Sequence, residues 1–348
     1  MQISPLYIYN FANTNLVQNQ KLQKRNVGLT IDCVSFNGKI IPNELKNIDF
    51  SKLNEYSTGV LDVINTGTFA QILKFKPHNQ IYAIKRLYPY KIKQPQGDLL
   101  PTKRQSLEQQ LKNEIAVYKK LKGVNEVPQL YLYNAGDKKN PSNNYIVTGW
   151  AEGRIPTQDG AIYDTKLVLK NLLQLFKTLA EFDNSGVLHN DLWAGNILFS
   201  KKGINIIDFN DSKIFNPQKE YKISNLDDFK KRFLNIFLSD VYHRKGKKEF
   251  LQTYNECLKL EHRFLIVKKE SSNSIKAKIY FDEKIKEIEN SIKNSQLLEN
   301  QAINTIYDSN IYWAKMMKIR ENQGDFRYYL ERASKLKLEN PEILGGIK

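Results

Sequence analysis

The chain lacks the sequence features of several large protein classes. With two cysteines in 348 residues, it has too few thiols for a disulfide framework or a zinc site, which fits a reducing compartment. No apolar run approaches the roughly 18 residues of a membrane-spanning helix. The first residues lack the charged and then apolar pattern of a signal peptide. These absences predict a cytoplasmic protein, with secretion as an effector into a foreign cytosol as the alternative.

Acidic residues are scarce relative to basic ones. The 53 lysines and arginines outnumber the 37 aspartates and glutamates, and the formal net charge is +16. Such a charge favours anionic partners, including nucleotides, phosphorylated sugars, acidic lipids and nucleic acid. No nucleic-acid-binding motif accompanies it, and a general enrichment in lysine explains it equally well. The charge is therefore compatible with an acidic acceptor molecule and with peripheral contact with a membrane.

One stretch carries most of the information about chemistry. Residues 189–199 read His-Asn-Asp-Leu-Trp-Ala-Gly-Asn-Ile-Leu-Phe. A turn that ends in glycine separates the last three of them from the apolar run at 204–207, which predicts a hairpin. Pairing would bring Asn196, which enters the first strand, and Asp208, which leaves the second, to the same edge. Amide and carboxylate oxygens at that edge suit a hard cation such as magnesium.

Asp191 lies on the loop that enters this hairpin, where it can accept a proton from an incoming hydroxyl. The loop and the Ile-Ile-Asp-Phe run that ends at residue 209 resemble the catalytic loop and the metal-binding motif of the protein kinase-like superfamily. That superfamily also includes aminoglycoside and choline phosphotransferases, fructosamine kinases and lipopolysaccharide kinases. The resemblance implies that Asp191 is the catalytic base, that Asn196 and Asp208 bind magnesium, and that His189 braces the loop.

Two upstream segments resemble further parts of that superfamily. Residues 82–87 read as a strand with Lys85 inside it, similar to the strand whose lysine binds nucleotide phosphates. A lysine on the solvent face of an edge strand is the alternative. Residues 104–122 show apolar positions at helical spacing, and the resemblance implies that Glu114 on this helix pairs with the lysine. Glu108 is the rival partner on the same helix.

The segment Ile-Asn-Thr-Gly-Thr-Phe-Ala-Gln-Ile at residues 64–72 resembles a glycine-rich loop over nucleotide phosphates. Only one of the three glycines of the family pattern is present. The resemblance places Gly67, Thr68 and Phe69 at the nucleotide. An ordinary hairpin turn is the alternative interpretation.

Residues 144–153 resemble the strand and hinge that join the two lobes of a kinase. The resemblance implies that Thr148 lies at the back of the adenine pocket. It also implies that backbone groups of Gly149 and Ala151 bind the adenine edge. Trp150 could face the nucleotide or simply pack against the protein.

The segment after Asp208 bears on the acceptor. Only about 16 residues separate Asp208 from a helix that we expect to begin near Asn225, with Asn225 as its cap. Phe229, Phe233 and Phe237 would form one face of this helix. The Asp pair at 227 and 228 resembles the buried aspartate that steadies the catalytic loop.

Several motifs of protein kinases are absent from the sequence. No Ala-Pro-Glu motif is present, and position 193 holds tryptophan in place of the lysine usual in serine/threonine kinases. With Gly195, Trp193 resembles the loop of fructosamine kinase-like enzymes. These departures favour a small-molecule or glycan hydroxyl over a protein hydroxyl.

The predicted fold is α+β: a two-lobed protein kinase-like fold with a small antiparallel sheet lobe that carries one helix, and a larger helical lobe. Residues 1–54 would form an N-terminal extension with a hairpin around Asn37-Gly38. Residues 55–150 would form the small lobe. Residues 151–348 would form the large lobe and its lysine-rich helical C-terminal region.

The sequence therefore predicts an ATP- and magnesium-dependent phosphotransferase that acts on a hydroxyl of a sugar, a lipopolysaccharide or another small molecule. Lys85, held by Glu114, would neutralise phosphate charge. The alternatives are a serine/threonine protein kinase, a pseudokinase scaffold without turnover, and an enzyme that transfers a nucleotidyl group.

Overall fold

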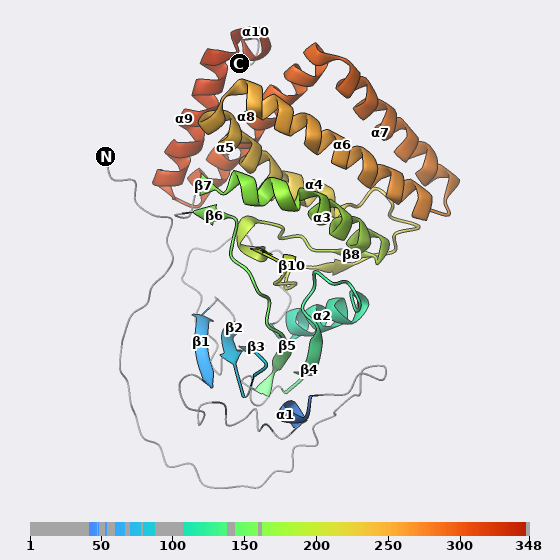
Figure 1. Cartoon of the computed structure of the whole chain (residues 1–348), viewed down its shortest axis with the longest axis vertical. Helices are drawn as coiled ribbons and strands as arrows, with labels where there is room; N and C mark the ends of the chain where they lie inside the picture. Colours follow the sequence, from blue (N-terminus) through green and yellow to red (C-terminus); the bar gives the residue numbers. More distant parts are fainter. Residues whose placement is uncertain are drawn as a thin grey trace. The chain divides into compact units, whose positions relative to one another are not determined.

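The computed structural model describes residues 42–46, 48, 53, 60–66, 70–77, 79–87, 107–137, 143–158 and 162–345. These residues form two compact units (Figure 1). The sheet unit holds the described residues up to Leu111 and those of Leu130–Trp150 and Thr157–Ile162. The helical unit holds Lys112–Gln129, Ala151–Pro156 and the described chain from Tyr163 onward.

The sheet unit is built on one antiparallel sheet of five strands in the order β1-β2-β3-β5-β4. The strands are β1 (Leu61–Thr66), β2 (Ala70–Phe75), β3 (Tyr82–Leu87), β4 (Leu130–Asn134) and β5 (Tyr145–Gly149). Along β3, Tyr82 and Ile84 are buried whereas Ala83 and Lys85 are half-buried, because successive side chains of a strand point to opposite faces. The antiparallel sheet of the predicted α+β fold is confirmed.

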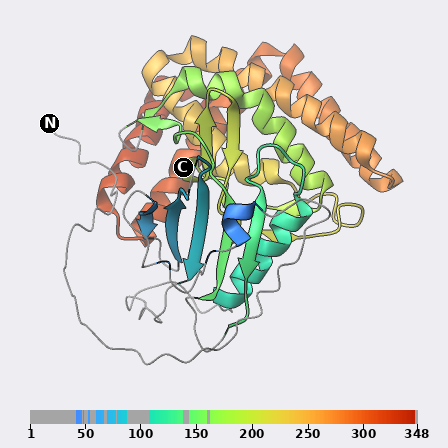
Figure 2. The same ribbon diagram turned by 60° about the horizontal axis from the view of Figure 1, so that its bottom comes forward.

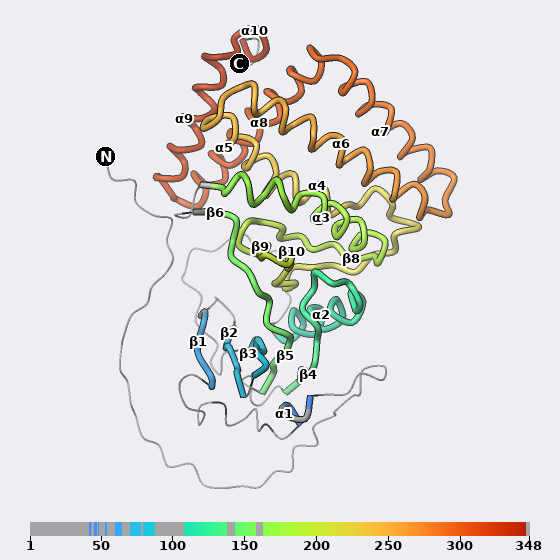
Figure 3. Tube along the Cα trace, in the orientation of Figure 1, coloured from blue at the N-terminus to red at the C-terminus, as the bar shows by residue number. Residues whose placement is uncertain are grey.

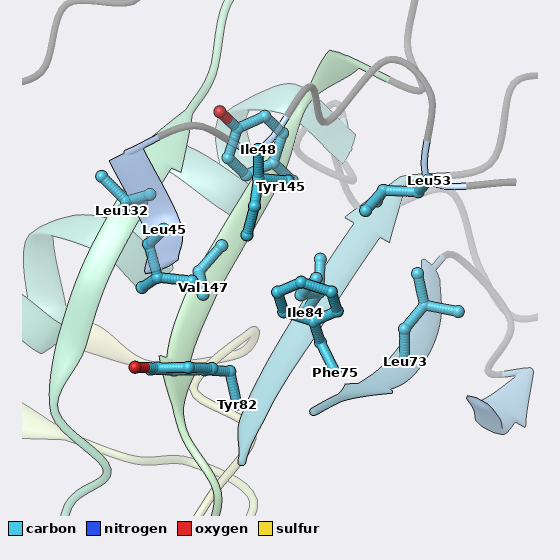
Figure 4. Packing of buried hydrophobic residues seen from close by; sticks show 10 residues of the cluster. All are labelled: Leu45, Ile48, Leu53, Leu73, Phe75, Tyr82, Ile84, Leu132, Tyr145 and Val147. Atoms are coloured by element: carbon cyan, nitrogen blue, oxygen red, sulfur yellow. The ribbon is translucent and has the colours of Figure 1, made fainter. Parts of the chain in front are cut away.

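One face of the sheet carries the core of this unit, which Figure 4 shows at close range. Leu73, Phe75 and Ile84 point into it from the strands. Leu45 from the short helix α1 (Asn43–Lys46) packs into the same cluster, and Figure 2 shows α1 beside the sheet. Ile48 and Leu53 join them, so the described part of the predicted N-terminal extension braces the sheet. The hairpin predicted around residues 37–38 lies outside the described residues.

The helix predicted over residues 104–122 is present as α2 (Leu107–Lys120). Leu111, Ile115 and Tyr118 form its buried side, as their helical spacing predicts. The helical unit contains α3 (Thr165–Asn184), whose N-cap Asp164 accepts a hydrogen bond from the Leu167 N–H.

The predicted catalytic hairpin consists of β9 (Ile197–Ser200) and β10 (Gly203–Ile206), which lie side by side in Figure 3. They pair in antiparallel register with Ile197 opposite Ile206. The remaining short strands are β6 (Thr157–Gln158), β7 (Ile162–Tyr163), β8 (Val187–Leu188) and β11 (Lys213–Ile214). The hairpin prediction is confirmed.

The helix expected near residue 225 begins as α4 (Asn225–Phe229) and continues through the π-helical turn η4 (Lys230–Leu234). The expected cap was wrong. The side chain of Ser224 accepts the Leu226 N–H, so Ser224 is the N-cap. Asn225 is fully buried instead, because its side chain bonds to the loop that precedes the hairpin.

The rest of the helical unit is α5 (Asn235–Lys245), α6 (Lys247–Ser271), α7 (Ile275–Lys293), α8 (Ser295–Ile319), α9 (Gln323–Glu339) and α10 (Pro341–Leu344). In Figure 1 α6 runs beside α7, and α8 lies near α9. Ile288 of α7 and Ile303 and Ile306 of α8 are buried, so each of these helices has a buried apolar side. None of the helices in the described part of the chain is long and apolar enough to cross a membrane.

The half-buried His243 in α5 should make the stability of the protein depend on pH. Burial, followed by the charges of Arg332 and Lys335, lowers the pKa of His243 to about 4. The unfolded chain takes up this proton below its ordinary pKa of 6.5 and the folded chain does not, so stability is retained above that value and falls as the pH drops towards 4. One such proton contributes a slope of at most about 1.4 kcal/mol per pH unit. Urea unfolding of the wild type and of His243→Gln between pH 7 and 4.5 should show a shallower slope for the variant, and equal slopes would contradict this assignment.

Candidate active site

The hairpin brings Asn196 and Asp208 to one edge, as predicted. Asn196 ends the 3-10 turn Ala194–Asn196, and its carbonyl oxygen accepts the Ile207 N–H at 3.0 Å. The next residue, Asp208, has a backbone φ of 64°, in the left-handed region that non-glycine residues seldom adopt. Strained residues of this kind gather at functional sites, which supports a role for Asp208.

Asn196 has an orientation that leaves its amide oxygen for another ligand. Its Nδ2 donates to the backbone oxygen and to Oδ2 of Asp191, at 2.9 Å each. Within the described part of the chain, no hydrogen bond is made to the Asn196 Oδ1 atom. The side chain therefore offers an oxygen and no N–H on its other side.

Asp191 is held through both of its carboxylate oxygens. Oδ1 accepts from Arg232 Nη1 at 3.1 Å, and Oδ2 accepts from Asn196. Burial raises the pKa of Asp191; Arg232 opposes this, and the negative charges of Asp211 and Asp208 add to it. The charges of Asp211 and Asp208 thus act on the Asp191 carboxylate from nearby positions.

The His189 side chain links the backbone of the catalytic loop to the backbone that precedes Asp208. It is fully buried, and burial lowers its pKa, so the ring is neutral. Its Nε2 lies 3.0 Å from the Ile207 carbonyl oxygen, and its Nδ1 accepts the Asp191 N–H at 3.3 Å. The ring therefore carries its proton on Nε2 and ties the backbone beside Asp208 to the backbone of Asp191.

Phe209 anchors the residue next to Asp208. Its buried ring packs against His189, Tyr118 and Phe182, with centroid distances of 4.8, 5.1 and 5.9 Å. The Asn113 side chain of α2 also donates to the Ser212 carbonyl oxygen. The backbone after Asp208 is thus fixed to both α2 and the catalytic loop.

A buried polar network under the loop was not predicted from the sequence. Asp183, at the end of α3, accepts hydrogen bonds from the backbone and side chain of Asn225 and from Ser224, and forms an ion pair with Lys268 at 3.0 Å. Asn225 Oδ1 in turn accepts the His189 N–H at 2.8 Å. The sequence offers a weak signal only, because a polar residue within an apolar helical stretch is equally compatible with exposure.

The Asp pair after Ser224 contributes through one member. Asp228 Oδ2 accepts the Leu192 N–H at 2.8 Å, which is the loop contact that the resemblance implied for this pair. Asp227 is exposed. Arg232 binds Asp228 at 2.6 Å and was not identified from the sequence. Its position four residues after Asp228 is the signal that could have found it.

The predicted phosphate-binding lysine of the sheet unit lies on a regular strand. Lys85 is on β3, opposite Ile72 and Ile146 in the register. Glu114 is buried in α2, whereas its rival Glu108 is half-buried. Their pairing with each other stays a prediction.

The structure describes the predicted hinge residues but not the predicted glycine-rich loop residues. Thr148 is buried on β5, and Gly149 ends that strand. The Trp150 N–H donates to the Ile81 carbonyl oxygen, and Lys74 Nζ lies 5.3 Å from the Trp150 ring centroid. Ala151 follows in the helical unit. Residues 67–69, with Gly67, Thr68 and Phe69, lie outside the described residues, although β1 and β2 flank them.

The donor set at the hairpin edge fits magnesium. Among the described residues no group of three or more histidine, cysteine, aspartate or glutamate side chains is arranged as a metal cage. Magnesium does not require one, because it is commonly bound by one or two carboxylates, by waters and by substrate phosphates. The Asn196 Oδ1 atom and the Asp208 carboxylate supply oxygen ligands of that kind.

Comparison with known proteins agrees with this geometry. Residues 59–230 match the protein kinase domain family. The matched region is therefore a domain of the protein kinase-like superfamily. No curated protein matches the sequence. The matched region ends inside η4, so α5 and all later helices lie beyond it.

Proposed function

We propose that this protein transfers the γ-phosphoryl group of ATP, with magnesium, to the hydroxyl of a small molecule or glycan. The observation that carries the proposal is the arrangement around Asp191. Its carboxylate is held by Asn196, and the same Asn196 keeps its amide oxygen turned away from Asp191. A base and a cation ligand are thus fixed side by side.

In the proposed reaction Asp191 accepts the proton of the acceptor hydroxyl. The acceptor oxygen forms a bond to the γ-phosphorus, the bond from that phosphorus to the bridging oxygen breaks, and ADP leaves. Asn196 and Asp208 would hold magnesium, which when bound neutralises phosphate charge. Lys85, supported by Glu114, would bind the phosphates of ATP.

The short segment after Asp208 supports a small acceptor. Its strand β11 pairs with β8, and the Phe215 N–H donates to the Gly186 carbonyl oxygen at 2.9 Å. Gly186 has φ +66°, and a Cβ there would lie 2.3 Å from the Phe215 oxygen, so only glycine allows this approach. The segment is therefore fixed against the catalytic loop, which leaves it less free to dock an extended peptide.

Trp193 offers a surface beside the proposed base. Its side chain is half exposed, and its ring covers Gly195, where an added Cβ would lie 2.4 Å from ring atoms. An exposed aromatic face suits a sugar ring or another flat acceptor. This supports a glycan or small-molecule acceptor over a protein hydroxyl.

Incubation with ATP labelled at the γ- or the α-phosphate tests the proposal directly. The acceptors would be a panel of sugars, lipid-linked glycans, acidic metabolites and a protein lysate. We expect the γ-label alone to move, onto a small molecule or glycan. Transfer of the α-label would indicate nucleotidyl transfer, label on protein would indicate a protein kinase, and no transfer with any acceptor would favour a scaffold.

Removal of the carboxylate that is proposed to bind magnesium should affect the ATP binding that depends on magnesium. We expect Asp208→Ala to abolish the stabilisation by ATP that depends on magnesium, because the main oxygen ligand is lost. Thermal shift with ATP, in magnesium or in EDTA, measures this. Asp211→Ala is the matched control, since Asp211 is a nearby exposed acid and should keep the shift. An unchanged shift in Asp208→Ala would discredit the metal site.

A further inference from the structure

A guanidinium group from outside the matched domain contacts the proposed base. Arg232 Nη1 lies 3.1 Å from Asp191 Oδ1, and Arg232 Nε lies 2.6 Å from Asp228 Oδ1. The other oxygen of Asp228 accepts the Leu192 N–H. One arginine therefore holds the Asp191 side chain directly and the backbone beside it through Asp228.

The π-helical turn explains how the helix presents Arg232 and still buries its apolar face. Phe229, Phe233 and Phe237 are all fully buried at a spacing of four residues. A regular α-helix with about 3.6 residues per turn would rotate such a series steadily out of line. The wider i→i+5 turn of η4 offsets that rotation. The three rings remain in the core while Arg232 stays on the side of Asp228.

The neighbours of Arg232 in the sequence are directed elsewhere. Lys230 Nζ bonds to both oxygens of Glu261, at 2.9 and 3.0 Å. Lys231 Nζ lies 4.4 Å from the ring centroid of Tyr312. Of these three consecutive basic residues, Arg232 is the one that contacts the catalytic loop. The contact with Asp191 therefore comes from the position of Arg232 and not from the positive charge of the segment as a whole.

The contact leaves Asp191 accessible. The side chains of Arg232 and Asp191 are 36% and 29% exposed, so an acceptor can approach them. Each oxygen of Asp191 has one N–H partner and keeps a lone pair for an incoming hydroxyl. Arginine suits this task better than lysine, because its planar fork bonds two carboxylates at once.

We propose that Arg232 is a positioning residue, which fixes the carboxylate of Asp191 and the backbone of the catalytic loop for phosphoryl transfer. The inference rests on the proposed function of Asp191. Arg232 lies in η4, just after the end of the region that matches the protein kinase domain.

Steady-state kinetics of the full chain test the inference. With magnesium-ATP and the acceptor that takes the γ-label, or water if hydrolysis is measurable, we expect Arg232→Gln to lower kcat by about 10- to 100-fold. The KM for ATP should change less than about twofold, since Arg232 contacts no predicted nucleotide-binding residue in the helical unit. Arg232→Lys should recover part of the loss. Lys231→Gln removes the same charge one residue away and should leave kcat unchanged.

Hydrogen exchange supplies a readout that does not depend on turnover. In Arg232→Gln the peptide covering residues 187–198 should take up deuterium several-fold faster, because Asp228 loses the contact that orients it towards the Leu192 N–H. Lys231→Gln should match the wild type. Wild-type exchange in Arg232→Gln, or a kcat within twofold of wild type, would overturn the inference. An inactive wild-type protein with the predicted exchange pattern would instead contradict the proposed function, while the role of Arg232 in fixing the loop would still be supported.

Discussion

Asp191→Asn should lower kcat by roughly 10²–10⁴-fold, the usual contribution of a general base. The substitution preserves size and shape. The amide oxygen can replace only one of the two accepting oxygens, but the backbone of the loop stays held through the Asp191 N–H to His189 and the Leu192 N–H to Asp228, so the loop should keep its position. What is lost is the ability to take the acceptor proton. The affinity for ATP, measured by calorimetry, should stay within about threefold because Asp191 is not a predicted nucleotide ligand.

A neighbouring acid provides the control for this experiment. Asp211 is exposed and contributes its negative charge to the surroundings of Asp191, but it has no predicted role in proton transfer. Asp211→Asn should therefore retain kcat within a few-fold of wild type. Full activity in Asp191→Asn would show that another group, or no group, serves as the base. Equal losses in both variants would point to the summed charge as the important quantity.

Lys268→Met should lower the free energy of unfolding by about 3–5 kcal/mol, the cost of leaving a buried charge without its partner. Lys268 and Asp183 have side-chain exposures of 4% and 0%, so water cannot replace the lost ammonium. The loss should also reach the catalytic loop, because Asp183 holds Asn225 and Asn225 holds the His189 N–H. Urea unfolding followed by circular dichroism gives the change in midpoint.

The adjacent residue is a matched control for Lys268. Lys269 forms an ion pair with Asp282 at 2.5 Å, with side-chain exposures of 37% and 45%. Exposed pairs contribute about 0–1 kcal/mol, so Lys269→Met should shift the unfolding midpoint little. Two variants one residue apart then differ only in burial of the lost ammonium. Similar small losses for both would show that the network under the loop is not a source of stability.

The catalytic hairpin was predictable because its signals are local. Alternating apolar runs, a turn ending in Gly203, and polar residues at both strand ends specify β9 and β10 without any other part of the chain. The meeting of Asn196 and Asp208 follows from antiparallel pairing alone. The same holds for α2 and α3, whose apolar positions repeat with helical spacing.

Contacts between distant segments were not predictable. Asn225 carries the sequence signal of a helix cap, yet the buried carboxylate of Asp183 binds its side chain and backbone, and Ser224 takes the capping role. Burial of a charged group, here paired with Lys268 from α6, outweighed the local preference. Arg232 was missed for the same reason, since an arginine four residues after an aspartate is usually a solvated surface pair.

Calorimetric titration of the wild type with a non-hydrolysable ATP analogue, in magnesium and in EDTA, tests the central claim most directly. The claim is that Asp208 and Asn196 form one metal and nucleotide site next to Asp191. We expect saturable binding at one site per chain in magnesium and at least tenfold weaker binding in EDTA. Equal affinity under both conditions, or no heat of binding in either, would contradict the claim.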